Sequence, residues 1–157
     1  MGFTDGAARP ASTTSPFGAV TTYTYSGNVK TATTNGHWVR TTMDGLGRTV
    51  KTETGDASGT KSVVDTVYSP CGCTPLGKMT QLSQPHAPGA TQYWTTYVYD
   101  ATGRTKTVTA PDGSVTKYDY SGNTVTVTDA ANNWKRFTMD AFGNLITVVE
   151  PDPTSAT

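Results

Sequence analysis

The 157-residue sequence has little charge, few cysteines and no long apolar segment, and each shortage excludes a class of protein. Twelve Lys and Arg residues balance twelve Asp and Glu residues without forming a basic cluster. Nucleic-acid partners are therefore not expected, because binding phosphates non-specifically needs an excess of positive charge. No apolar run approaches the roughly 20 residues that cross a bilayer as a helix, so no membrane span is expected.

Helical periodicity is lacking as well. Gly or Pro interrupts most windows in which apolar residues could recur at helical spacing. About one residue in five is Thr and 10% are aromatic, and both kinds of side chain favour strands. Residues 124–128 alternate Thr with Val, as a half-buried strand requires. These patterns predict an all-β protein with about a dozen short strands.

The sequence repeats itself. The motif Tyr-x-Tyr-Ser-Gly-Asn at residues 23–28 returns at residues 118–123. Downstream, the segment from Trp38 to Gly47 returns from Trp134 to Gly143, and a weaker copy begins at Tyr97. Self-similarity of this kind indicates serially paired structural units rather than one irregular enzyme core.

Turn-forming residues separate the expected strands. Three segments share the form Asp-x-x-Gly, with the pairs Asp44 and Gly47, Asp100 and Gly103, and Asp140 and Gly143. The Asp can accept bonds from backbone amides further along the turn, and the Gly can adopt the left-handed conformation that ends it. Arg48 and Arg104 follow their glycines, and we expect each to lock its turn through the aspartate. Asn35-Gly36 and Asp112-Gly113 are the strongest signals for two-residue hairpin turns.

The residues after Tyr99 carry the motif of a known family. The segment Tyr99-Asp100-Ala-Thr-Gly103-Arg104, followed by Pro111-Asp-Gly113 and Tyr118-Asp-Tyr120, resembles the YD repeat of RHS and teneurin-type proteins. The copy at Met43 has Met in place of Tyr, and the copy at Met139 also has Asn144 in place of Arg. The resemblance extends over about residues 20–150.

The resemblance implies a continuous, twisted sheet of antiparallel β-hairpins. In larger relatives such a sheet spirals into a hollow shell that can enclose a toxin or the C-terminal part of the chain. We expect the repeat domain to cover residues 20–150, with an N-terminal linker or strap at 1–19 and a C-terminal tail at 151–157. Residues 69–92, rich in Pro, are expected to form an inserted loop or an expanded hairpin tip. Residues 1–20 lack a signal-peptide pattern, so we expect either a removed leader or a segment of a longer chain.

Cys71 and Cys73 are the first candidate site. They could staple the inserted loop as a disulfide or remain two small thiols. A zinc site with His86 and His37 is one alternative, but zinc motifs usually place two to four residues between paired cysteines. Redox chemistry is another, because a disulfide that closes so small a ring is strained and easily reduced. We expect no metal and no cofactor.

Trp38, Trp94 and Trp134 are the second candidate site. They could stack on sugar rings, or they could pack as core residues that cover a hairpin face. Arg40 and Arg136 follow two of them by two residues, and we expect each to lie on the same face and to bond an aspartate of a turn. The sequence contains no nucleophile motif or carboxylate pair, so an enzyme is not expected.

The sequence thus favours a structural β-repeat protein, secreted or on the cell surface. Open sheet edges recruit further strands, so we expect either a homo-oligomer, as a filament or shell, or pairing with neighbouring repeats of a longer chain. Two alternatives stay open: a carbohydrate-binding module with glycans as partners, and a fragment of a toxin-encapsulating shell.

Overall fold

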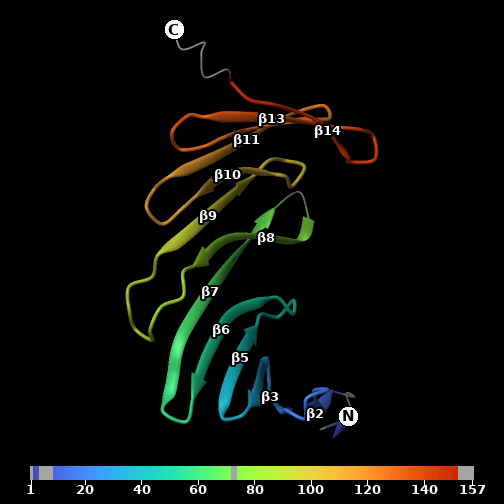
Figure 1. Ribbon diagram of the computed structural model, residues 1–157. Helices are drawn as coiled ribbons and strands as arrows, with labels where there is room; N and C mark the ends of the chain where they lie inside the picture. Colours follow the sequence, from blue (N-terminus) through green and yellow to red (C-terminus); the bar gives the residue numbers. More distant parts are fainter. Residues whose placement is uncertain (1, 4–8, 72–73, 152–157) are drawn as a thin grey trace. The chain divides into compact units, whose positions relative to one another are not determined.

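The computed structural model describes residues 2–3, 9–71 and 74–151, which form 14 β-strands and contain no helix (Figure 1). The predicted all-β fold is confirmed. The strands are β1 (Gly2–Phe3), β2 (Pro10–Thr14), β3 (Val20–Ser26), β4 (Val29–Thr34), β5 (His37–Met43), β6 (Thr49–Asp56), β7 (Gly59–Cys71), β8 (Thr74–Ser83), β9 (Trp94–Tyr99), β10 (Thr105–Thr109), β11 (Val115–Ser121), β12 (Thr124–Thr128), β13 (Trp134–Met139) and β14 (Leu145–Val149).

The strand order follows the chain from β1 to β14, so each strand neighbours the strands before and after it in sequence. The pairings are antiparallel from β1 to β7 and again from β9 to β14. The chain divides into two compact units. The first comprises Met1–Tyr68 and Leu82–Tyr93, and the second comprises Ser69–Gln81 and Trp94–Thr157.

The sequence repeat is also a structural repeat. In the first unit Tyr23 is the register partner of Ala32, and in the second Tyr118 is the partner of Val127. The turn residue Asn28 accepts a bond from the backbone N–H of Met43 at 3.0 Å and donates from its amide to the Met43 carbonyl. Asn123 makes the same two contacts with Met139. Strands β3–β6 and β11–β14 are therefore two copies of one arrangement.

Little of the described chain is deeply buried. Val63 and Val125 are its buried apolar residues, and Ser83 is its buried polar residue. Strand β3 alternates between exposed and partly buried positions, and β4 is partly buried along its whole length. Contacts across neighbouring strands stabilise such a sheet, and the hydroxyls of Thr21 and Thr34, 2.6 Å apart, are one example. The many threonines therefore make contacts across neighbouring strands and place hydroxyls at exposed positions of the sheet.

Strands also form within the N-terminal and the Pro-rich segments that the sequence analysis distinguished. Within residues 1–19, expected to form a linker or a strap, Pro10–Thr14 forms strand β2, which pairs with β3. Its three hydroxyl-bearing residues favour a strand without showing the apolar alternation that marks a half-buried one. Within residues 69–92, β7 and β8 extend through most of the predicted insertion. The prolines there suggested a long loop or an expanded hairpin tip; β7 and β8 are neighbours in the sheet order, and residues 84–93 form a long connection outside the strands.

Candidate functional site

The Asp-x-x-Gly-Arg segments form locked turns between strands. Asp44 Oδ1 accepts the backbone N–H of Leu46 at 2.9 Å and that of Arg48 at 3.0 Å, while Arg48 Nε donates to Asp44 Oδ2 at 2.7 Å. Asp100 holds Thr102 and Arg104 in the same way, with a distance of 2.7 Å from Arg104 Nε to Asp100 Oδ2. The contacts expected between each arginine and its aspartate are present.

Two turns use Asn in place of Arg. Asn144 Nδ2 donates to Asp140 Oδ2 at 2.8 Å, and Asn133 Nδ2 donates to Asp129 Oδ2 at 3.0 Å. Gly143 adopts the left-handed conformation in the first turn, and Asn132 adopts it in the second, at φ 64°. The turn at Asp129 was missed from the sequence because Asn stands where the motif has Gly.

The donors in these turns stabilise the ionised aspartates. The hydrogen bond from Arg48 lowers the pKa of Asp44, and the bond from the Thr102 hydroxyl is the largest cause of the lowered pKa of Asp100. The bond from Asn144 lowers the pKa of Asp140. Each carboxylate therefore has a structural role in its turn at neutral pH.

Arginines also cover tyrosine rings on the next strand, which the sequence analysis did not predict. The guanidinium carbon of Arg48 lies 4.4 Å from the ring centroid of Tyr68, and that of Arg9 lies 4.4 Å from the centroid of Tyr25. At Tyr99, the first residue of the YD motif, a lysine takes this place: the Lys78 ammonium lies 5.4 Å from the ring centroid. The Tyr99 hydroxyl donates to the Met79 carbonyl at 2.7 Å, and burial raises its pKa.

The tryptophans are partly buried, and the guanidinium group of an arginine lies over the ring of two of them. Arg40 lies 4.7 Å from the ring centroid of Trp38, and Arg136 lies 5.3 Å from that of Trp134. Trp38 also donates its indole N–H to the Asp56 carbonyl at 3.0 Å. Trp94 is the first residue of β9, and Trp134 is the first residue of β13. Three strands, β10 to β12, lie between them in the sheet. Two of the proposed sugar-stacking rings thus already have a cation over one face.

The expected bonds from these arginines to turn aspartates are not what the structure shows. Arg40 pairs with the strand residue Glu53 at 3.7 Å, its partner in the register of β5 and β6. Arg136 is aligned with Val149 and contacts the Thr126 hydroxyl at 3.4 Å. Both arginines lie in strands, where cross-strand neighbours are nearer than the turns at the strand ends.

Strand β14 forms an exposed apolar edge in the second unit. Among the described strands it pairs with β13 alone. All five of its residues are exposed, including Leu145, Ile146, Val148 and Val149, and Phe142 in the preceding turn is exposed too. This arrangement combines free backbone hydrogen-bonding groups with exposed apolar side chains.

An open groove of about 530 Å³ lies across β11, β12 and β13. Its lining includes the apolar groups of Tyr118, Val127, Phe137 and the sugar-stacking candidate Trp134, and Asn133 contributes an amide. Lys135 and Glu150, also in its lining, form an ion pair of 2.6 Å. Tyr118 corresponds to Tyr23 in the first unit, where the Lys30 ammonium lies 4.9 Å from the ring centroid. Val125 stands in the position of Lys30 in the second copy.

Cys71 ends β7, but its side chain and Cys73 lie outside the described part of the structure, and so does the staple expected between them. Among the residues that the structure does describe, no three metal-binding side chains lie close enough to hold an ion. The same part of the chain contains no helix that could cross a membrane.

Comparison with known proteins identifies one segment. Residues 99–133 match the family model described as RHS Repeat. The match begins at Tyr99, covers the Asp100 turn and strands β10, β11 and β12, and ends at the Asp129 turn. A comparison with curated proteins finds no match to the chain. This match confirms the resemblance of the chain to the RHS and YD-repeat family.

Proposed function

We propose that this chain is a structural scaffold of the RHS type, secreted or on the cell surface, that self-associates through its sheet edges into a filament or shell. RHS repeats are typical of secreted or cell-surface proteins, which supports the location. The proposal assigns the chain no catalytic activity. A fragment of a toxin-encapsulating shell is a variant of this proposal, in which the same edges close the sheet around a cargo.

The exposed apolar edge of β14 carries this proposal. Natural sheets usually protect an edge with charge, proline or a covering segment, because unpaired backbone groups recruit other strands. Four of the five residues of β14 are apolar instead: Leu145, Ile146, Val148 and Val149. Pairing with a further strand would satisfy the free backbone groups and cover these side chains together.

The backbone of β14 indicates which groups a further strand would meet. Met139 donates its N–H to Asn123 on the β12 side, so the preceding residue, Thr138, directs its backbone groups toward β14. Thr138 is aligned with Thr147. The backbone groups of successive residues point alternately to the two edges of a strand. Val148, which follows Thr147, therefore directs its N–H and C=O toward the open edge.

A matched pair of substitutions tests the edge. Val148 and Val98 are similarly exposed, at 45% and 48%, but Val98 lies in β9, an inner strand with neighbours on both sides. We expect concentration-dependent association of the purified chain in sedimentation velocity, weakened by Val148→Lys and unaffected by Val98→Lys. Electron microscopy of the associated protein would distinguish filaments from closed particles. A wild-type chain that stays monomeric at high concentration, or equal effects of both substitutions, would contradict the proposal.

The groove on β11–β13 supports a second candidate, carbohydrate binding. A tyrosine ring without a covering cation can stack on a sugar ring, and neighbouring polar groups can bond its hydroxyls. Among the described residues no cation covers the Tyr118 ring, whereas Lys30 covers the ring of its counterpart Tyr23. Addition of soluble oligosaccharides, followed by NMR, should shift the resonances of the groove residues. Tyr118→Leu should abolish these shifts, and Tyr23→Leu should leave them unchanged. Equal loss in both variants would contradict a site at the groove.

A further inference from the structure

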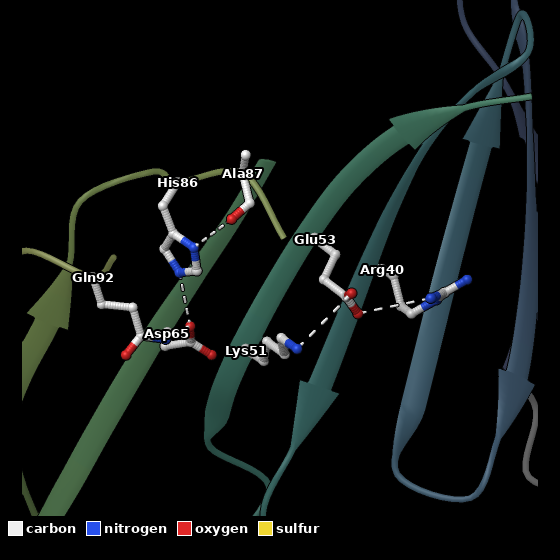
Figure 2. Close-up of polar contacts among 7 residues, drawn as sticks. All are labelled: Arg40, Lys51, Glu53, Asp65, His86, Ala87 and Gln92. Carbon is white, nitrogen blue, oxygen red and sulfur yellow. Dashed lines mark hydrogen bonds and ion pairs between the residues drawn. The ribbon is translucent and has the colours of Figure 1, made fainter. Parts of the chain in front are cut away.

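The connection between β8 and β9, residues 84–93, lies against β7 in the first unit (Figure 2). His86 and Val63 form an antiparallel bridge, with Val63 N–H donating to His86 O at 2.8 Å and His86 N–H to Val63 O at 3.0 Å. Val63 is only 3% exposed. The connection therefore satisfies backbone groups on the side of β7 that faces away from β6.

Asp65 on β7 is the second point of attachment. Its Oδ2 atom lies 3.0 Å from His86 Nε2 and accepts a bond from Gln92 Nε2 at 2.8 Å. Its backbone N–H donates to the hydroxyl of Ser83, the buried last residue of β8, at 2.8 Å. Both ends of the connection thus converge on one carboxylate.

The His86 ring faces an acceptor at each nitrogen, as Figure 2 shows. Nδ1 lies 3.0 Å from the Ala87 carbonyl oxygen, and Nε2 lies 3.0 Å from the Asp65 carboxylate. Neither acceptor can donate: a carbonyl has no proton, and an ionised carboxylate has none. A neutral imidazole carries one N–H, so it can satisfy only one of the two. Both contacts are hydrogen bonds only when the ring is an imidazolium.

The hydrogen bonds and charges around the His86 ring favour the imidazolium on balance. The bond to the Ala87 carbonyl and the bond to Asp65 raise the pKa of His86 above 6.5, although burial and the Lys51 ammonium oppose them. Lys51 lies on β6, aligned with Asp65, and its ammonium is 4.0 Å from the Glu53 carboxylate. Glu53 also pairs with Arg40 on β5. The His86 side chain is 9% exposed, so water replaces its partners poorly.

We propose that His86 is a proton-dependent clamp that holds residues 84–93 against β7 when its ring is charged and loosens them when the ring is neutral. Loss of the proton leaves one ring nitrogen with its lone pair directed at an acceptor oxygen. Because the folded-state pKa is raised, the clamp is complete below the ordinary pKa of 6.5. Its contribution is lost as the pH rises through the folded-state value, and the backbone groups of Val63 then become accessible.

Nitrogen-15 NMR of the His86 ring, recorded on the full chain from pH 5 to pH 9, tests the protonation state. We expect both ring nitrogens to carry protons at the acidic end and a titration midpoint above 6.5. In the same samples, the hydrogen-exchange protection factor of the Val63 amide should fall by about two- to tenfold across that midpoint, the range that one hydrogen bond contributes. His86→Gln should remove this pH dependence.

The wild-type titration decides the question even if His86→Gln does not fold. A ring that holds a single proton throughout the range would overturn the clamp. So would a Val63 protection factor that does not follow the titration of His86. The Thr126 amide, on a central strand of the second unit, provides the control and should keep a constant protection factor across the same range.

Discussion

The guanidinium carbon of Arg104 lies 4.3 Å from the ring centroid of Tyr120, and the same guanidinium pairs with Asp100 at 2.7 Å. One side chain thus joins the turn before β10 to strand β11. Arg48 joins its own turn to Tyr68 on β7 in the same way. The arginine of the YD motif therefore has two structural roles: it closes its turn, and it fixes that turn against the next hairpin strand.

Replacing Arg104 by Lys should weaken both contacts while keeping the charge. Lysine keeps the charge but loses the planar group that pairs with Asp100 and stacks on Tyr120. We expect a loss of about 0.5–1 kcal/mol in the free energy of unfolding, the value of a partly exposed cation–π contact, measured by urea denaturation. Lys106→Gln on the neighbouring strand changes an exposed cation and should have a smaller effect. An Arg104 variant as stable as the wild type would show that the planar guanidinium contributes nothing measurable beyond its charge.

The aspartates of the turns should make stability fall at acidic pH. The bonds that they accept lower the pKa values of Asp44, Asp100 and Asp140 below 3.8 in the folded state. Their stabilisation is thus fully present above the unfolded-state value and is lost as the pH falls through the folded-state values. Denaturation midpoints measured from pH 7 to pH 2 should decrease below about pH 4. Asp100→Asn should flatten this decrease, and an unchanged slope would show that other groups cause it.

The sequence predicted what depends on near neighbours along the chain. Asp44 and Arg48 are four residues apart, so their contact follows from turn chemistry alone. The stack of Arg48 on Tyr68 depends on the register of β6 and β7, which no local pattern specifies. His86 and Asp65 meet for a similar reason, because the β8–β9 connection returns to β7. Spacing in the sequence therefore finds the turns but not the contacts that the pairing of strands creates.

Gly55 should tolerate no side chain. A Cβ atom at this position would overlap the indole ring of Trp38 and the carbonyl oxygen of Gly59. Gly55→Ala should therefore lower the free energy of unfolding by about 1–3 kcal/mol, the usual cost of overpacking. Trp fluorescence should also change, because the ring must move. Gly45→Ala is the control: its Cβ meets nothing within 4 Å, so it should be close to neutral.

Asn28 and Asn123 test whether the two copies of the repeat are energetically equivalent. Each asparagine bonds the backbone of a methionine at the end of the strand after next, Met43 in one copy and Met139 in the other. Replacement by Ala removes a side-chain donor in each case, so we expect similar losses of about 0.5–1.5 kcal/mol in the free energy of unfolding. The two residues belong to different compact units and share no partner, so their effects should add in the double variant. Ser121→Ala, beside the Asn123 turn, should be nearly neutral, because its exposed side chain takes no part in the contact. A large loss at one asparagine and none at the other would mean that the repeat conserves geometry without conserving its energetic role.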